Sequence, residues 1–546
     1  MRQFIITIFT FLAVASYPVS AQSVMPIKSL AMGTPALLEQ LTSSKLKQSL
    51  KILQSIADVE NSNVLPLFST MLAGNLYFIK TNKQLISVVS SGTNTKYHDL
   101  LSAKELGSVN KKDIKKIRVN NKIRVYLRNL IAQLQLTASD PLKRANSLKS
   151  LLDDLDPQTI AVIAKLRINE QNGKVKILMD LALNIDKAQN ATLVIDKIKA
   201  ITALEDSLEP QVRETLIKIS SLYSTLTDAD SKAVSKAANK ALLSIKQTTE
   251  IYGYIDQLFF GLSLGSVLLL AAIGLAITFG MMGVINMAHG EMIMLGAYTT
   301  YVVQQLMPNF IEYSLWVALP LAFVVSACVG ILIERFVIRY LHGRPLETLL
   351  ATFGISLILQ QLVRSIFSPL NRQVSSPQWM SGSWEINPIF SLTYNRLYIL
   401  AFALLVFFAL LFILKKTSLG LNVRAVSQNR AMAKAMGIKT HRVDAMTFGL
   451  GSGIAGIAGV ALSQLTNVGP NLGQAYIIDS FMVVVFGGVG NLLGTLVAAF
   501  SLGIANKILE PMTGAVLASI LVLVFIILFI QKRPKGLFPQ KGRASE

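Results

Sequence analysis

Cysteine is almost absent from this sequence: Cys328 is the only one among 546 residues. One thiol excludes a disulfide framework and a thiolate metal site within a single chain. The sequence also lacks the G-x-x-x-x-G-K-S/T pattern of a P-loop and the H-E-x-x-H pattern of a zinc metalloprotease. We therefore expect no metal, no cofactor and no enzymatic activity, and in particular no ATPase site in this chain.

Charged residues are also few, at 15% of the chain, whereas 52% are hydrophobic and the mean hydropathy is +0.50. Such a chain is too apolar for an ordinary soluble enzyme. The net charge is +21, and a basic balance can indicate nucleic acid as a partner. In the second half, however, many lysines and arginines lie in short connections between apolar runs, which is the positive-inside pattern of a polytopic membrane protein. This pattern indicates membrane lipid as the partner, and no nucleic acid is expected.

The N-terminus has the pattern of a secretory signal peptide over residues 1–21. Arg2 supplies a positive charge, a short apolar stretch follows, and Val19-Ser20-Ala21 resembles a small-residue cleavage site. The alternative is an uncleaved first membrane helix, but the apolar stretch is short for a span. Cleavage would put residues 22–250 outside the cytoplasm, which means the periplasm in a bacterium with two membranes.

Residues 22–250 show leucine and isoleucine at helical spacing, in units of roughly 35 to 45 residues. Asp140-Pro141 and Asp156-Pro157 supply cap and first-turn chemistry for two of the helices. We therefore expect a periplasmic α-helical domain of the HEAT repeat type. Residues 75–91 are an exception, because their alternation predicts a strand pair with a turn at Asn82-Lys83. No catalytic constellation is visible in this domain.

From about residue 251 onward the sequence is a series of long apolar runs. They lie near 256–280, 284–306, 314–338, 346–368, 396–414, 446–466, 474–490, 492–509 and 512–531. The two around Gly487 and Gly494 are short, so one of them is a candidate for a broken or re-entrant helix. With the N-terminal side outside, the basic connections between the runs face the cytoplasm. We expect an all-α membrane bundle of eight or nine spans over residues 251–535, with residues 536–546 as a cytoplasmic tail.

Glycine is dense in these runs. GLSLG at 261–265, GLGSG at 449–453 and GNLLG at 490–494 have the small-xxx-small spacing that lets helix backbones approach closely. GSGIAG at 451–456 also matches the dinucleotide fingerprint G-x-G-x-x-G, but no strand precedes it. Close helix packing is therefore the better explanation of that stretch.

Three polar residues interrupt the apolar run at 284–306, namely Asn286, His289 and Glu291. Ionisable groups are unfavourable in lipid and are kept there mainly where they face a cavity, a pathway or a partner. These residues are our candidates for groups that line or gate a solute pathway through the membrane. Two other interpretations stay open: an interfacial segment whose polar groups reach water, and a polar contact that holds two helices together.

The basic connection at 419–442 is helical in pattern, rich in alanine and interrupted at Gly437. A helix–glycine–helix element on the cytoplasmic side can act as a lever on which a soluble partner pushes. An ordinary amphipathic linker at the membrane interface would have the same composition. The pattern alone does not choose between the two.

Four stretches together resemble a known family. GVINMAHGEMIMLGAY at 283–298, RAVSQNRAMAKAMGI at 424–438, VVVFGGVGNLLGTLVAAF at 483–500 and RPKGLFPQ at 533–540 follow one another in this order. They resemble the permease family that imports branched-chain amino acids through ATP-binding-cassette (ABC) systems. The resemblance implies that the second stretch is the coupling loop that docks on an ATPase subunit, with Arg424, Asn429, Ala431 and Gly437 among its residues.

The domain before the membrane runs is not typical of the amino-acid permeases and resembles the urea-transporting branch of the family. The resemblance then implies a urea importer of the bacterial inner membrane. In it this chain would pair with a second permease, two ATP-binding subunits and a periplasmic solute-binding protein, and only the ATP-binding subunits would bind ATP. Import of branched-chain amino acids or related amides is the alternative within the family. A passive solute channel or a membrane receptor is the alternative of another class.

Overall fold

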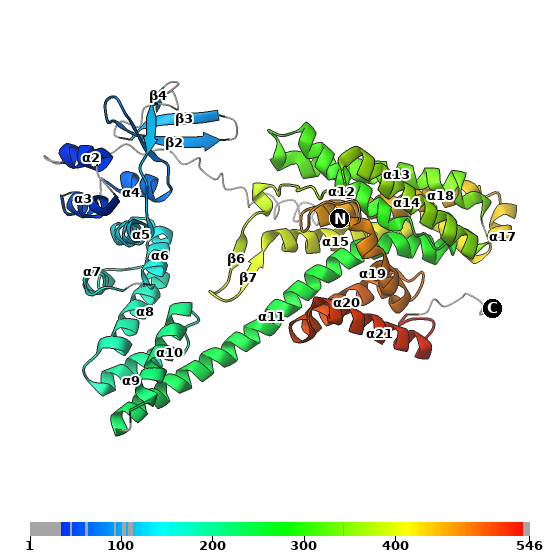
Figure 1. The fold of residues 1–546 in the computed structure, drawn as a ribbon. Helices are drawn as coiled ribbons and strands as arrows, with labels where there is room; N and C mark the ends of the chain where they lie inside the picture. Colours follow the sequence, from blue (N-terminus) through cyan, green and yellow to red (C-terminus); the bar gives the residue numbers. More distant parts are fainter. Residues whose placement is uncertain are drawn as a thin grey trace. The chain divides into compact units, whose positions relative to one another are not determined.

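The computed structural model describes residues 34–43, 46–59, 64–91, 94–100, 105–106, 113–153, 155–226, 228–341 and 343–538 (Figure 1). The predicted signal peptide at residues 1–21 lies outside this set. The chain divides into two compact units, and their boundary falls between Thr248 and Thr249, inside helix α11 (Ala229–Met282). Residues 34–248 form the N-terminal unit and residues 249–538 the C-terminal unit.

The N-terminal unit contains short helices and one antiparallel sheet. Its helices before α11 are α2 (Thr34–Ser43), α3 (Leu46–Val59), α4 (Leu65–Leu72), α5 (Asn121–Gln135), α6 (Pro141–Leu151), α7 (Pro157–Arg167), α8 (Gly173–Asn190), α9 (Val194–Ala203) and α10 (Pro210–Ser224). Its strands are β1 (Leu76–Ile79), β2 (Leu85–Ser91), β3 (Asn94–Asp99), β4 (Glu105–Leu106) and β5 (Ile114–Lys116), paired in the order β4-β3-β2-β1-β5.

The described chain is mostly helical, as predicted, but its N-terminal unit contains a five-stranded sheet where only one strand pair was predicted. The strand pair predicted at 75–91 is confirmed as β1 and β2, with Phe78 opposite Leu85 and Lys83 at φ 56° in the turn. The sequence does not predict β3 and β5, because polar residues such as Lys96 and Lys115 break the apolar alternation. Pairing with β2 and β1 holds these strands in the sheet, since tertiary context outweighs strand propensity.

Two hydrophobic cores lie in the N-terminal unit, one formed by α2–α5 with the sheet and the other by α5–α10 with the start of α11. The predicted caps are confirmed: the carboxylates of Asp140 and Asp156 accept from the backbone N–H groups of Leu142 and Thr159, at 2.9 and 2.5 Å. α5 packs on α6, and α8 packs on α7 and α9. Helices pair here as an array of repeats requires, and the HEAT type remains a prediction.

The C-terminal unit is a helical bundle (Figure 1). After α11 its elements are α12 (His289–Leu306), α13 (Ile311–Phe336), η1 (Ile338–Tyr340), α14 (Pro345–Phe367), η2 (Gln378–Met380), β6 (Ser383–Glu385), β7 (Ser391–Thr393), α15 (Tyr394–Lys416), α16 (Ser418–Gln428), α17 (Arg430–Ala435), α18 (Thr440–Ser463), α19 (Leu472–Gly487), α20 (Leu492–Thr513) and α21 (Ala515–Lys532). Each predicted apolar run corresponds to one of these helices.

Seven helices of the described chain are long and apolar enough to cross a membrane, namely α11, α13, α14, α15, α18, α20 and α21. α12 is not among them because it carries His289, Glu291 and two glutamines. α19 is not among them because it has only 16 residues. By length and composition alone the described chain thus has seven candidate spans, which is consistent with a polytopic helical bundle. The count of eight or nine remains a prediction.

α11 and α18 form the centre of the bundle. The most apolar windows of these two helices are 78% and 83% buried, whereas that of α21 is 17% buried. α18 packs against α12 and α13, and α19, α20 and α21 pack against one another. Large apolar side chains such as Trp316, Leu350 and Phe525 are exposed on α13, α14 and α21, as expected of helices that face lipid or another subunit. Cys328 is exposed on α13.

Glycine allows close helix approach at the predicted positions. A Cβ atom on Gly261 would lie 2.7 Å from the Cα atom of Ile504 in α20. In the GSGIAG stretch, which lies within α18, a Cβ atom on Gly451 would lie 2.8 Å from the carbonyl oxygen of Gly274 in α11. A Cβ atom on Gly494 in α20 would lie 2.1 Å from the carbonyl oxygen of Gly487 in α19. The prediction of close helix packing is confirmed.

The end of the described chain folds back on α19. The backbone N–H groups of Leu537 and Phe538 donate to the carbonyls of Phe486 and Gly487, at 2.9 and 3.2 Å. Nδ2 of Asn491 donates to the carbonyl of Phe538 at 3.2 Å. The first residues of the predicted cytoplasmic tail therefore belong to the bundle, while residues 539–546 lie outside the described chain.

Candidate functional site

The predicted polar trio lies at a break between α11 and α12. α11 ends at Met282, Gly283 has a φ of 69°, and α12 begins at His289, so residues 283–288 are not helical. Non-helical backbone at membrane depth is tolerated only where protein or a cavity covers it. Protein covers the three polar residues of this break, because Asn286, His289 and Glu291 are each at most 1% exposed.

Asn286 shapes the turn before α12. Its Oδ1 accepts from the backbone N–H of Ala288 at 3.0 Å. The backbone N–H of Met287, between these two residues, donates to Oγ1 of Thr352 in α14 at 3.1 Å. Nδ2 of Asn286 has no hydrogen-bond partner among the described residues. A buried amide donor is thus left unpaired, which is unfavourable unless another molecule satisfies it.

His289 points toward α11. Its Nε2 lies 2.9 Å from the carbonyl oxygen of Ala271, and because a carbonyl only accepts, Nε2 carries the proton. The ring packs on Gly274, where a Cβ atom would lie 2.8 Å from Cε1 of the histidine. Nδ1 is then an acceptor, and no donor reaches it from the part of the chain that the structure describes.

Glu291 points toward α14. Its Oε1 accepts from Oγ of Ser356 at 2.9 Å and from Nε2 of Gln360 at 2.7 Å. Nε2 of Gln360 also lies 3.4 Å from Oε1 of Gln474 in α19. The other carboxylate oxygen, Oε2, has no partner within the described residues. The structure thus brings the trio into one buried segment, but His289 and Glu291 bind different helices.

The N-terminal ends of α12 and α19 meet beside Glu291. A Cβ atom on Gly473 would lie 1.7 Å from the carbonyl oxygen of Gly290, and one on Gly290 would lie 2.6 Å from the carbonyl oxygen of Gly473. The N-terminal end of a helix carries a partial positive charge from its free N–H groups. Glu291 lies in the first turn of α12, where this charge favours a carboxylate.

A stripe of polar residues on α14 was not among the predicted site residues. It consists of Thr348, Thr352, Ser356, Gln360 and Arg364. Thr352, Ser356 and Gln360 bind the segment from Met287 to Glu291, and Arg364 donates to Oδ1 of Asn471 at 2.7 Å. The signal that could have found the stripe is its four-residue spacing, which puts polar side chains on one face of an otherwise apolar helix.

The residues assigned to the coupling loop lie in a compact helical segment. Arg424 in α16 donates to the carbonyl of Leu414 in α15. Asn429 caps α17, because its Oδ1 accepts from the backbone N–H of Met432 at 2.9 Å. Ala431 is exposed on α17. This segment therefore presents a short, capped helix whose surface is open to a partner.

Gly437 ends α17 with a φ of 84°. Its N–H donates to the carbonyl of Lys434 at 3.1 Å, and the N–H of Ile438 donates to the carbonyl of Ala433 at 3.0 Å. This is the Schellman pattern of a helix C-terminus. No described atom lies within 4 Å of the position that a Cβ atom would take, so glycine is needed here for its backbone conformation. Its action as a lever remains a prediction.

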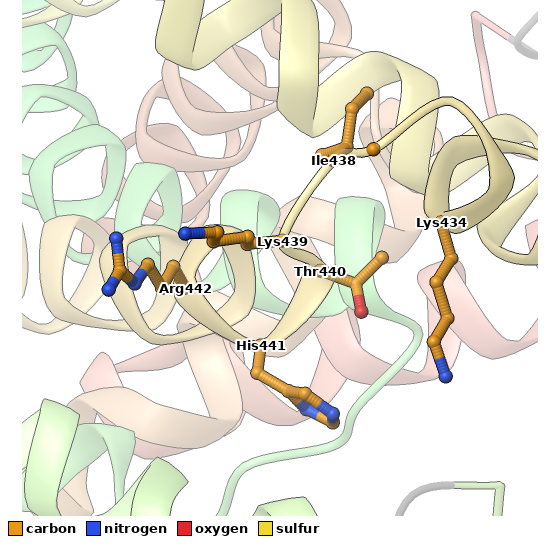
Figure 2. A pocket seen from close by; sticks show the side chains of 7 residues that line it. Lys434, Ile438, Lys439, Thr440, His441 and Arg442 are labelled. Carbon is orange, nitrogen blue, oxygen red and sulfur yellow. The ribbon is translucent and has the colours of Figure 1, made fainter.

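A shallow pocket of about 410 Å³ opens beside this cap (Figure 2). It is lined by Lys434, Gly437, Ile438, Lys439, Thr440, His441 and Arg442. Figure 2 shows Lys434, Thr440 and His441 directed to one side, and Lys439 and Arg442 directed to another. Two lysines and an arginine but no carboxylate line the pocket, so its charge favours an acidic partner.

Two kinds of catalytic site find no support in the described chain. No group of three His, Cys, Asp or Glu side chains among the described residues could hold a metal ion. GLSLG at 261–265 has the G-x-S-x-G spacing of serine hydrolases, but it lies inside α11. Such a site needs a strand-to-helix turn that exposes the serine.

Comparison with known proteins identifies relatives of the C-terminal unit. Residues 257–530 match the family described as "Branched-chain amino acid transport system / permease component". One relative is the high-affinity branched-chain amino acid transport system permease protein BraD of Pseudomonas aeruginosa. The two sequences are 29% identical over 299 residues, and the aligned region covers 53% of this chain and 96% of BraD. A second relative is LivH of Escherichia coli, a permease protein of the same description. It is 30% identical to this chain over 295 residues, and the aligned region covers 52% of this chain and 95% of LivH.

A more distant relative is the ribose import permease protein RbsC of Escherichia coli, 26% identical over 263 residues that cover 46% of this chain and 77% of RbsC. No solved structure gives a significant match. The family match includes the polar break, the α14 stripe and the segment around α17, and the N-terminal unit before residue 249 lies outside it. The family predicted from four sequence stretches is confirmed: the chain belongs to the permease components of branched-chain amino acid transport systems.

Proposed function

We propose that this chain is a permease subunit of an ABC importer and that it forms the solute pathway with a second permease. The observation that carries the proposal is the family match over residues 257–530, which coincides with the helical bundle and its buried polar break. The sequence contains no P-loop, so two separate ATP-binding subunits would drive transport. The protein would then lie in a bacterial inner membrane, with lipid against its exposed apolar faces.

The solute of this importer is urea in our first proposal. The N-terminal unit supports this proposal, because it is extra. BraD and LivH are matched over nearly their full length, yet the match covers only about half of this chain. The extra unit is the feature that resembles the urea-transporting branch. Branched-chain amino acids or related amides are the second candidate, favoured by what the names of BraD and LivH say these relatives transport.

Asn286, His289 and Glu291 are proposed to line or gate the pathway. Each is buried and each has one polar atom without a partner in the described chain. Urea, amides and amino acids all combine N–H donors with an oxygen acceptor, which these groups can satisfy. Unpaired atoms at three neighbouring buried residues favour a pathway role, because buried polar groups are normally satisfied.

The segment with Arg424, Asn429, Ala431 and Gly437 is proposed to dock on an ATPase subunit. Its exposed helix α17 and the basic pocket beside Gly437 support docking of an acidic surface. ATP binding would then shift the bundle between two states, because ATP binds one state of the assembly better than the other. On the other side of the membrane, a periplasmic binding protein would deliver the solute, and residues 22–250 would lie on that side.

Uptake of radiolabelled urea and leucine tests the proposal. A strain that lacks the whole system is complemented with all subunits, or with all except the ATPase subunits. We expect one of the two probes to be taken up, and this uptake to require the ATPase subunits. Uptake that persists without them would support a passive channel, and uptake of neither probe by the complete system would reject the importer and favour a receptor.

A further inference from the structure

The carboxylate of Glu291 is bound on one side only. Two donors from α14, Ser356 and Gln360, hold Oε1, while Oε2 has no donor in the described chain. Leaving a buried carboxylate oxygen unpaired is unfavourable. The oxygen is therefore a site that a donor from another molecule would fill with a gain in free energy.

The unpaired polar atoms of this segment favour a small solute with both donors and acceptors. Nδ2 of Asn286 is an unpaired donor on the same buried segment, and it suits a carbonyl or carboxylate oxygen. The two helix ends at Gly290 and Gly473 stabilise the charge of Glu291, so a solute need not be a cation to bind it. Urea, simple amides and amino acids fit these requirements, because each has N–H groups beside an oxygen acceptor.

We propose that Glu291, held in place by Ser356 and Gln360 of α14, accepts a hydrogen bond from an N–H group of the transported solute. This inference rests on the proposed importer function and names the chemical class that the site selects. The α14 stripe would then be one wall of the pathway, and opening between α12 and α14 would admit the solute to Oε2. Ser356 and Gln360 would act as positioning residues, because they hold Glu291 without contacting the solute.

Replacing Glu291 by glutamine tests this inference in the complete transporter. The E291Q variant keeps an acceptor for Ser356 and Gln360 but presents an NH₂ donor where the solute N–H would bind. We expect uptake of whichever probe the wild type transports, urea or leucine, to fall about tenfold or more. The amount of assembled complex should not change. E347Q is the matched control, since Glu347 lies on α14 in an exposed ion pair.

Uptake by E291Q within twofold of the wild type would overturn the inference. It would also be overturned if E291Q lost uptake only in proportion to lost complex, because Glu291 would then act in packing. Uptake of neither probe by the wild type would reject the importer function and this inference together, so the two failures are distinguishable.

A second inference rests on an ion pair of the docking segment. Arg430 of α17 forms this ion pair with Asp444 of α18, and the side chains are 32% and 6% exposed.

An arginine of the docking segment is thus the partner of a buried carboxylate on another helix. A buried carboxylate is strongly destabilising when it loses its partner. We infer that Arg430 is a positioning residue that ties movement of α17 to α18.

Charge exchange tests this inference in the assembled transporter. R430A should reduce uptake about tenfold while the amount of assembled complex is unchanged. R430D combined with D444R should recover part of the uptake, because the pair can form again. R344A is the control, since Arg344 forms only an exposed ion pair with Glu347. Wild-type uptake by R430A, or a double variant no better than either single variant, would overturn the inference.

Discussion

Replacing Gly296 by alanine should force α12 away from α18. A Cβ atom at this position would lie 1.9 Å from the carbonyl oxygen of Gly456 and 2.6 Å from its Cα atom. Both are backbone atoms, so no side chain can rotate away, and the helices must separate by about 1.5 Å to reach ordinary contact. Overpacking destabilises by roughly 1–3 kcal/mol and occasionally more. The better helix propensity of alanine offsets at most about 1 kcal/mol, so the net effect is destabilising.

Thermal unfolding of the full-length protein in detergent measures this effect. After heating, the fraction that stays monodisperse in size-exclusion chromatography gives an apparent midpoint, which G296A should lower by several degrees. Gly354 in α14 is the matched control, because it is also helical and no described atom lies within 4 Å of its Cβ position. G354A should leave the midpoint unchanged or raise it slightly. Equal midpoints for the two variants would refute the steric argument.

Three further outcomes are expected. Gly437→Asn should retain more uptake than Gly437→Val, because asparagine tolerates a positive φ and a β-branched residue does not; equal uptake would show that the cap is not required. His289→Ala should reduce uptake while the assembled complex keeps basal ATP hydrolysis, and a loss of complex instead would indicate packing. The hydrogen-bonded Arg144 guanidinium lowers the pKa of the Glu170 carboxyl. The pair therefore stabilises the folded N-terminal unit at neutral pH, and this stabilisation is lost as the pH falls through the lowered pKa. The gap in unfolding midpoint between wild type and R144A should therefore shrink on acidification, and a constant gap would contradict this linkage.

The positions of the membrane helices follow from the sequence because the signal is local. Each long apolar run marks one helix of the bundle by itself, and the glycines within the run mark where helices pack closely. The start of α12 could not be predicted in this way. The run at 284–306 looks continuous, but the N–H of Met287 is held by Thr352, which is 65 positions away in the chain. A helix boundary set by a distant residue leaves no trace in a local pattern.

The candidate site shows the same division. Glu291 stands out in the sequence because a carboxylate in an apolar run is rare. Its partners do not, since serine and glutamine at Ser356 and Gln360 are individually common and become informative only when α14 is placed beside α12. That His289 binds α11, whereas Glu291 binds α14, also depends on tertiary structure and cannot be read from the local sequence. Sequence reasoning therefore finds the charged centre of the site and misses the residues that hold it.

The single thiol gives the native chain a spectroscopic handle. Cys328 is exposed near the middle of α13, so one nitroxide or dye can be attached without substituting any residue. A lipid-soluble maleimide should reach this thiol from the bilayer, whereas a charged maleimide should not. If assembly of the transporter protects Cys328 from the lipid-soluble maleimide, α13 borders the second permease. If labelling is unchanged, α13 borders lipid, and the attached probe reports membrane depth in the working complex.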